Sequence, residues 1–299
     1  MNMRKLIFIG ALFLLFSCGN RNRGSNGENP QEKQLNISIF LDLSDRINPE
    51  SAITARYPVH PPQWERDVEI VRTITEIFRR DMNNRTAWNA RGRIRVFFSP
   101  VPPNPAINDI ASQLNIDCSR MDNRERKVVF DTLTPLFVNS LTEIYTQTIQ
   151  ANQWIGSDIW RFFQNDVKDF CIANEDNYRN ILVILTDGYI FHRQSVYNVQ
   201  NRYSYLLQRN ISRYRTRDYR ERIQNDNFGL IATRNDLHNL EILVLGISAE
   251  NNRHRIDEDI LKFVLGNWFD EMNVARHQIF STDLPVNTNI RIENFFNIR

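Results

Sequence analysis

The sequence predicts an α/β protein with one doubly wound, mostly parallel, Rossmann-like sheet that carries helices on both faces. Apolar runs predict its strands, and amphipathic segments between them predict its helices. Strands that are buried on both faces are near-continuous in Val, Ile and Leu, which favours parallel pairing. Such strand–helix alternation favours one sheet over a sandwich or a bundle, so we expect the strongest runs to be neighbouring strands. These runs are Ile37–Leu41, Ile94–Phe98, Ile181–Leu185 and Ile242–Leu245.

The other elements follow from helical spacing and from shorter runs. A helix is predicted over Trp64–Met82, because its apolar residues recur every three or four positions between Arg and Glu. A second helix covers about Asp122–Thr148, where Pro135 must either kink it or restart it with Thr134 as N-cap. Further expected elements are a short edge strand at Leu114–Cys118, helices at Asp158–Phe170 and Ile256–Phe269, and a last strand at Gln278–Ser281.

Composition and motifs exclude several classes of function. With 299 residues, of which 41% are hydrophobic, the chain can bury a sizeable core. The 37 basic residues include Arg4 and Lys5, which lie in a segment that we expect to be removed, and the remaining 35 balance the 35 acidic residues. Net charge therefore gives no argument for a nucleic-acid partner, and none is expected. No G-x-S-x-G, P-loop, G-x-G-x-x-G or H-E-x-x-H motif occurs, so the corresponding hydrolase, nucleotide and zinc chemistries have no support.

Residues 1–17 predict a secretory signal peptide. Arg4 and Lys5 precede the eleven-residue apolar run Leu6–Phe16, which is too short to span a bilayer as a helix. The region Leu15-Phe16-Ser17-Cys18 resembles a bacterial lipobox. That resemblance implies cleavage before Cys18, lipidation of its sulfur and acylation of its amine, and several acyl chains anchor a protein stably in a membrane. The alternative is a plain cleaved signal followed by an incidental cysteine.

Residues 18–34 lack a bulky apolar side chain and predict a flexible tether, so that residues 35–299 form the folded domain. Gly19 and Asn20 follow Cys18 in place of Asp, which resembles lipoproteins of the outer membrane. We therefore expect a lipid-anchored protein of the cell envelope, at the outer membrane. Two further cysteines, Cys118 and Cys171, could form one disulfide or stay as two buried thiols, because sequence alone does not place them within bridging distance.

Two of the predicted strands deliver a carboxylate at their carboxyl ends. Asp42 follows the run Ile37–Leu41, and Asp187 follows Ile181–Leu185 within the motif Thr186-Asp187-Gly188. Ligands of open α/β sheets bind in the crevice outside these strand ends. Two acids that arrive there from separate strands predict either a cation site or a paired-carboxylate active site.

Three motifs in this order resemble the von Willebrand factor A domain. They are a strand that ends in D-x-S, a G-[ST]-D loop and a strand that ends in T-D-G, here Asp42 and Ser44, Gly156-Ser157-Asp158, and Thr186-Asp187-Gly188. The resemblance covers about residues 35–299 and implies a Rossmann-like fold with a metal-ion-dependent adhesion site. In such a site a divalent cation bridges to an acidic group of a protein partner. The implied metal ligands are Asp42, Ser44, Ser157 and Asp187, and hydroxyl and carboxylate oxygens suit a hard ion such as Mg²⁺.

Arg46 departs from the family pattern, since it stands at the position of the second serine of D-x-S-x-S. A guanidinium is unfavourable beside a dication and offers no lone pair to a metal. Either Arg46 turns away and Asp45 compensates, or the site holds no metal and Arg46 pairs with Asp42 or Asp187. Asp45, Arg46 and Asp158 are therefore candidate modulators of the site.

Three functional hypotheses follow from these observations. The leading one is a lipoprotein without enzymatic activity that binds a protein partner through a divalent cation. The alternatives are a metal-dependent hydrolase, which would use Asp42 and Asp187 with His192 as acid/base, and a structural envelope subunit with a degenerate metal site. Residues 189–222 are rich in Arg and Tyr, which is compatible with a solvated helix face, a partner surface or a nucleic-acid surface.

Overall fold

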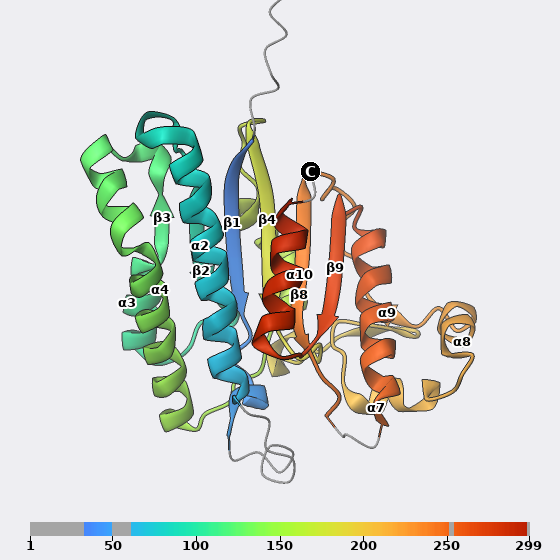
Figure 1. Cartoon of the computed structure of the whole chain (residues 1–299). Coiled ribbons are helices and arrows are strands. Elements are labelled where there is room, and N and C mark those ends of the chain that lie inside the picture. The colour runs from blue at the N-terminus through green and yellow to red at the C-terminus, as the bar shows by residue number, and fades with distance from the viewer. Residues whose placement is uncertain (1–32, 50–60, 251–253, 298–299) are drawn as a thin grey trace, which may run out of the picture. The chain divides into compact units, whose positions relative to one another are not determined.

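The computed structural model describes residues 33–49, 61–250 and 254–297, which belong to one compact unit that begins at Lys33. Its centre is a six-stranded sheet with the order β3-β2-β1-β4-β8-β9 (Figure 1). The strands are β1 (Gln34–Leu41), β2 (Arg93–Phe97), β3 (Asn115–Asp117), β4 (Tyr178–Leu185), β8 (Leu240–Ile247) and β9 (Arg276–Ser281). The predicted signal peptide, Cys18 and most of the predicted tether lie outside the described residues.

Helices occupy most connections between these strands. They are α2 (Gln63–Asn89), α3 (Pro105–Gln113), α4 (Asn123–Ala151), α5 (Ile159–Asn165), α6 (Val167–Cys171), α7 (Gln208–Ile211), α8 (Tyr219–Asn225), α9 (Ile256–Glu271) and α10 (Pro285–Asn297). The 3₁₀ turns of the described residues include η1 (Asp45–Ile47), η2 (Cys118–Arg120), η3 (Arg193–Ser195) and η4 (Ser212–Tyr214). Among the described residues, no helix is both long and apolar enough to cross a membrane.

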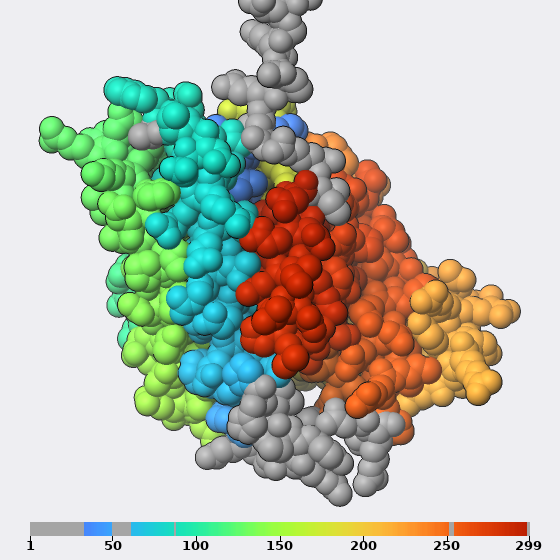
Figure 2. All heavy atoms as spheres, in the orientation of Figure 1, coloured from blue at the N-terminus to red at the C-terminus, as the bar shows by residue number. Residues whose placement is uncertain are grey.

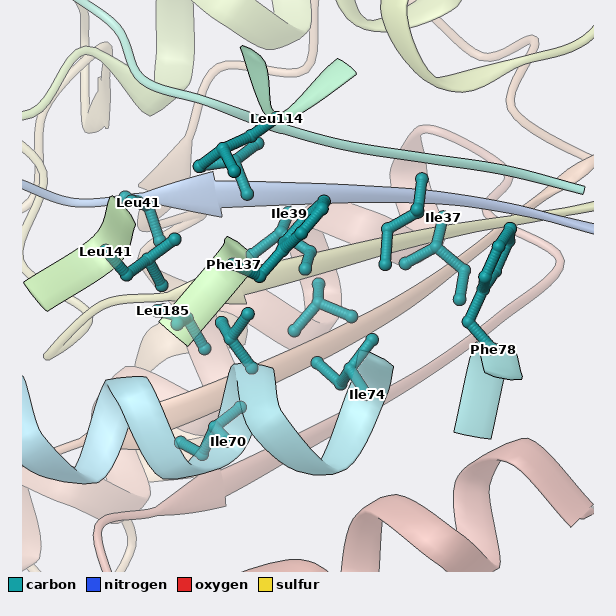
Figure 3. Close-up of a cluster of buried hydrophobic side chains, with 14 of the residues drawn as sticks. Ile37, Ile39, Leu41, Ile70, Ile74, Phe78, Leu114, Phe137, Leu141 and Leu185 are labelled. Atoms are coloured by element: carbon teal, nitrogen blue, oxygen red, sulfur yellow. The ribbon is translucent and has the colours of Figure 1, made fainter. Parts of the chain in front are cut away.

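Side chains of the central strands alternate between two cores, one on each face of the sheet. Ile37, Ile39 and Leu41 of β1 lie in the first core with side chains of α2, α4 and α10, and Figure 3 shows several of these contacts. Phe40 of the same strand lies in the second core with side chains of α5, α6 and α9. Helices therefore cover both faces, and the predicted doubly wound α/β fold is confirmed.

Strand pairing agrees with the sequence prediction at most points. The β2–β3 pair is antiparallel and the other pairs of this sheet are parallel, with the four apolar runs as neighbours in the order β2-β1-β4-β8. β1 is buried at every position, but β2 alternates, with Ile94 and Val96 buried between partly exposed residues. The prediction that β2 is buried on both faces was therefore wrong. Its outer neighbour β3 is only three residues long and leaves part of β2 exposed.

Several helices differ from the prediction in extent. The predicted Trp64–Met82 helix is the longer α2, which is interrupted near its end by Thr86 with φ of +66°. Pro135 lies inside α4, which continues through it as one helix. The region Asp158–Phe170 forms two short helices, α5 and α6, and the sequence prediction did not include α3 or α10.

The connection between β4 and β8 contains α7, α8 and a small second sheet. Its strands are β5 (Asn198–Val199), β6 (Arg202–Tyr203) and β7 (Gly229–Leu230), in the order β5-β6-β7. Cys118 and Cys171 are both buried and unpaired, which decides between the two alternatives for these cysteines.

Candidate functional site

The parallel register of β1 and β4 brings the two predicted carboxylates to adjacent strand ends. Leu41 pairs with Leu185, so Asp42 lies beside Thr186. The carboxyl ends of β1 and β4 form the lower edge of the sheet in Figure 1. Asp42 is fully buried, and both of its carboxylate oxygens accept hydrogen bonds. The Ser44 amide donates to Oδ1 at 2.9 Å and the Thr186 hydroxyl donates to Oδ2 at 2.7 Å. These bonds fix the orientation of the Asp42 carboxylate.

The Thr186-Asp187-Gly188 turn is held by its own side chains. The Gly188 amide donates to the Thr186 hydroxyl at 3.1 Å, and the Tyr189 amide donates to Asp187 Oδ1 at 3.0 Å. Gly188 has φ of +96°, and a Cβ there would lie 2.8 Å from Cδ1 of Ile247. The position therefore requires glycine. The turn leaves Asp187 partly exposed, in contrast to the buried Asp42.

Arg46 lies inside this site, where its side chain is 2% exposed. Its Nε donates to the Asp42 backbone carbonyl at 2.9 Å and lies 3.9 Å from Asp42 Oδ2. Its Nη2 donates to Asp67 Oδ2 at 2.6 Å, so its main ion-pair partner is a carboxylate of α2. Of the two predicted partners, Asp42 is confirmed, and among the described residues the ion pairs of Arg46 do not include Asp187.

Asp67 and Tyr145 belong to this cluster of contacts, and the sequence analysis missed them. Asp67 is fully buried and accepts hydrogen bonds from the Tyr145 hydroxyl at 2.8 Å and from Gln63 Nε2 at 2.9 Å. A signal for Asp67 was present, because it lies three positions after Trp64 and four before Val71, on the apolar face of the predicted helix. An acidic residue at a core position of a helix predicts a buried charged partner.

The charges at the site do not balance. One guanidinium, that of Arg46, pairs with the carboxylates of Asp42 and Asp67, and a third carboxylate, that of Asp187, lies close enough to feel its charge. Burial alone would lower the pKa of Arg46, but the charges of Asp67 and Asp42 raise it above its ordinary value, so Arg46 stays charged. Burial, and then the charge of Asp42, raise the pKa of Asp187 to about 8. A proton on Asp187 therefore relieves the excess negative charge near neutral pH.

The second predicted motif lies in a loop beside the turn that follows β4. The Ser157 amide donates to the Phe191 carbonyl at 2.9 Å, and the Phe191 amide returns a bond at 3.1 Å. Asp158 accepts from the Arg161 amide at 3.2 Å as the N-cap of α5, and it also accepts from the Ser195 hydroxyl. Asp158 is therefore a capping residue, whose carboxylate accepts these two hydrogen bonds.

The remaining candidates are Ser44, Asp45 and His192. Ser44 is partly exposed and precedes η1, and Asp45 is exposed but close enough to raise the pKa of Asp187. The Nδ1 atom of His192 lies 3.1 Å from the Ile155 carbonyl, which orients the ring toward the Ser157 loop. The acid/base role that a hydrolase would require of His192 has no support in these contacts.

Whether these residues suit a divalent cation depends on their open oxygens. Ser157 Oγ is buried and has no hydrogen-bond partner in the described part of the chain, which would suit a hard ion. Both Asp42 oxygens accept hydrogen bonds, however, and the charged Arg46 Nε lies 3.9 Å from Asp42 Oδ2, where its charge would repel a dication. Within residues 33–49, 61–250 and 254–297, no group of three or more His, Cys, Asp or Glu could hold a metal ion. The side chains present do not fit a divalent cation, and its binding stays an untested prediction.

Comparisons with known proteins do not assign this site. No protein-family model matches the chain, and a search of curated proteins gives no match. The functional argument therefore rests on the geometry of the carboxyl edge, by which we mean Asp42, Arg46, Asp67 and Asp187 with their direct partners.

Proposed function

We propose that this chain is a lipid-anchored envelope protein whose von Willebrand factor A-like domain binds a protein partner at the carboxyl edge of its sheet. Two observations support the family resemblance. The sheet is parallel apart from its short edge strand β3, and the D-x-S and T-D-G motifs end the neighbouring strands β1 and β4. Ligands of open α/β sheets bind at this edge.

The burial and hydrogen bonding of the two carboxylates, Asp42 and Asp187, favour a binding function over hydrolysis. Catalysis by paired carboxylates needs two groups that can reach a substrate. Asp42 is buried with both oxygens hydrogen-bonded, so Asp187 alone is left to meet another molecule. This arrangement supports a binding edge that presents Asp187 beside the exposed Asp45. A structural envelope subunit is the second candidate, and the buried Arg46–Asp67 pair favours it, because the same pair would stabilise an edge that binds nothing.

Photo-crosslinking distinguishes these two candidates in the full-length, membrane-anchored chain. A photoreactive residue in place of the exposed Asp45 should give a discrete adduct with a protein partner, and the adduct should weaken in the Asp187→Asn background. The same photoreactive residue in place of Val128, which is 60% exposed on α4, is the matched control. Equal adducts from both positions, or none from Asp45, would contradict partner binding at the edge.

Arg46 is proposed to supply the positive charge that a metal supplies in the family. Titration calorimetry and thermal melts with Mg²⁺ and Mn²⁺ should then give no heat and no change in Tm for the wild type. A bound metal would add about 2.7 kcal/mol at a hundredfold excess over Kd, an effect that Asp42→Ala and Asp187→Ala should remove. If Arg46 is the substitute, Arg46→Ser should bind a metal that the wild type does not bind.

The lipid anchor is proposed from the lipobox and has its own test. Cys18→Ala should prevent lipidation and either release the protein from the membrane fraction or leave it unprocessed. Maturation and detergent partitioning like the wild type would show that Cys18 is incidental.

A further inference from the structure

An arginine-rich segment begins directly after the carboxyl edge. Residues Tyr189–Arg222, which we call the arginine lobe, contain eight arginines and two acidic residues, Asp218 and Glu221. Helix α8, which begins at the end of this lobe, projects beyond α9 at the margin of the compact unit, where Figure 2 shows a group of gold spheres. The arginines are Arg193, Arg202, Arg209, Arg213, Arg215, Arg217, Arg220 and Arg222.

Most of this positive charge is not neutralised within the domain. Arg202 pairs with Glu271 and Arg215 pairs with Asp257, each at 2.7 Å. Five others are exposed, and in the part of the chain that the structure describes none of them lies within ion-pair distance of a carboxylate. These five are Arg193, Arg209, Arg213, Arg217 and Arg220. A segment with such an excess of one charge attracts the opposite charge.

Aromatic rings hold several of the exposed guanidinium groups in place. Arg209 lies 5.9 Å from the ring centroid of Tyr205, Arg213 lies 4.8 Å from that of Tyr214, and Arg220 lies 5.6 Å from that of Tyr219. Stacking limits the rotation of a guanidinium. Arg213 also donates to the Asn201 side chain and Arg220 donates to the Tyr219 hydroxyl. Within the described part of the chain, the planar N–H fork of Arg209 stays open at its edge. That fork matches a carboxylate, which it can bind through two parallel hydrogen bonds.

The lobe also exposes apolar side chains. Val196, Tyr197 and Val199 are 49%, 54% and 47% exposed. The bridge between Phe191 and Ser157 ties the start of the lobe to the loop beside the edge. Arginine and tyrosine are enriched in protein interfaces, and partly apolar surface supports protein contacts more than solvation alone.

We propose that the arginine lobe binds an acidic segment of a protein partner. The inference rests on the proposed partner-binding function and adds the chemistry of the partner. A carboxylate-rich chain supplies bidentate acceptors for the exposed guanidinium groups of Arg193, Arg209 and Arg217, and its apolar residues meet Val196, Tyr197 and Val199. Single-stranded nucleic acid fits the lobe less well, because its bases need open aromatic faces. Among the tyrosines of the lobe only Tyr197 is exposed, Tyr214 is fully buried, and Arg209, Arg213 and Arg220 lie over the rings of Tyr205, Tyr214 and Tyr219, so successive bases would find few open rings.

The experiment uses the purified full-length chain in detergent and fluorescein-labelled poly-L-glutamate as the probe, followed by fluorescence anisotropy. Binding should weaken steeply between 0.1 M and 1 M salt, because the screening length falls from about 10 Å to about 3 Å. The triple variant Arg193→Gln, Arg209→Gln and Arg217→Gln should bind the probe roughly tenfold more weakly, as expected for three exposed ion pairs.

A matched variant controls for net charge. Arg120→Gln, Arg124→Gln and Lys127→Gln remove the same charge from three exposed positions at η2 and the start of α4, and should leave binding unchanged. Equal weakening in the two triple variants would overturn the proposal. Tighter lobe-dependent binding of oligo-dT, or of vesicles that contain phosphatidylglycerol, would also overturn it by assigning the lobe to another class of partner. Crosslinking at Asp45 tests the carboxyl edge separately, so either proposal can fail alone.

Discussion

The carboxyl edge and the arginine lobe both depend on arginine, but in opposite surroundings. At the edge, Arg46 is almost completely buried and forms ion pairs with Asp67 and Asp42. In the lobe, five arginines are exposed, and three of them stack on tyrosine rings. A buried ion pair is costly to break, because the remaining charge stays without solvent, whereas an exposed charge is well solvated. The same residue type should therefore stabilise the fold in one region and serve binding in the other.

The largest effect is expected at Arg46. Arg46→Met leaves the Asp67 carboxylate buried without its cation and should lower the free energy of unfolding by about 3–5 kcal/mol. Urea-induced unfolding measures this value. The double variant with Asp67→Asn should recover part of the loss, because it removes the uncompensated charge.

Arg80 provides the control for this prediction. It pairs with Glu293 on the surface, where its side chain is 58% exposed, and Arg80→Met should cost less than about 1 kcal/mol. If Arg46→Met were as mild as Arg80→Met, the carboxyl edge and the surface would not differ as described.

The residues of the carboxyl edge could be predicted from the sequence only in part. The central strands were predicted because both of their faces are covered, which makes them continuous apolar runs. Asp42 and Asp187 follow from the ends of those runs and a parallel register. The partner of Arg46 could not be predicted in this way, since Asp67 is 21 positions away on α2 and meets it only when the helix packs on the sheet.

Other elements gave weaker sequence signals for physical reasons. The strands β5, β6 and β7 are two residues long, too short to show a period. The helix α10 buries Ile292 and Phe295 but leaves Val286 and Ile290 exposed, so its apolar pattern is broken. Stacking of arginine on tyrosine in the lobe follows from the fold, and the sequence alone left three interpretations of that segment open.

A smaller effect on stability is expected from a substitution of Thr186, the uncharged hydrogen-bond partner of Asp42. Thr186→Val keeps the shape of the side chain but removes the hydroxyl that donates to Asp42 and accepts from the Gly188 amide. The loss of a hydrogen bond to a buried carboxylate should lower the free energy of unfolding by about 2 kcal/mol, as measured in urea. Thr132→Val removes a hydroxyl that bonds the Val128 carbonyl on an exposed part of α4 and should change stability little. Equal losses in both variants would argue against a special role of the buried edge.

The pH dependence of stability should separate Asp187 from ordinary carboxylates. Its pKa is raised to about 8 by burial and by Asp42, so the folded chain binds this proton more tightly than the unfolded chain. Its contribution to stability is complete below about pH 4 and is lost as the pH rises toward about 8. Asp187→Asn should therefore become more stable than the wild type across this window, by about 2 kcal/mol after allowance for partial exposure.

Asp117 in β3 should behave in the opposite way. Hydrogen bonds from Ser119 and the charge of Arg93 outweigh the effect of burial and hold the pKa of Asp117 below its usual value. Its contribution is present above about pH 4 and is lost on acidification. Asp117→Asn should therefore be less stable than the wild type at neutral pH, and the difference should shrink in acid. Thermal melts of the two variants from pH 4 to pH 9 should give differences from the wild type of opposite sign, and equal signs would refute the assignment at Asp187.

The smallest effect on stability is expected in the arginine lobe, where exposed arginines can be compared directly with one that pairs with a buried carboxylate. The variant Arg193→Gln, Arg209→Gln and Arg217→Gln should change the free energy of unfolding by no more than about 0.5 kcal/mol per substitution, because the removal of a solvent-exposed charge has little effect on stability.

Arg215 of the same lobe is the internal control. Its partner Asp257 is fully buried, so Arg215→Gln should cost about 1–3 kcal/mol in the same urea assay. A triple variant that unfolds as easily as Arg215→Gln would mean that the exposed arginines hold the lobe together. Stability like the wild type, together with weaker binding of poly-L-glutamate, would assign them to recognition.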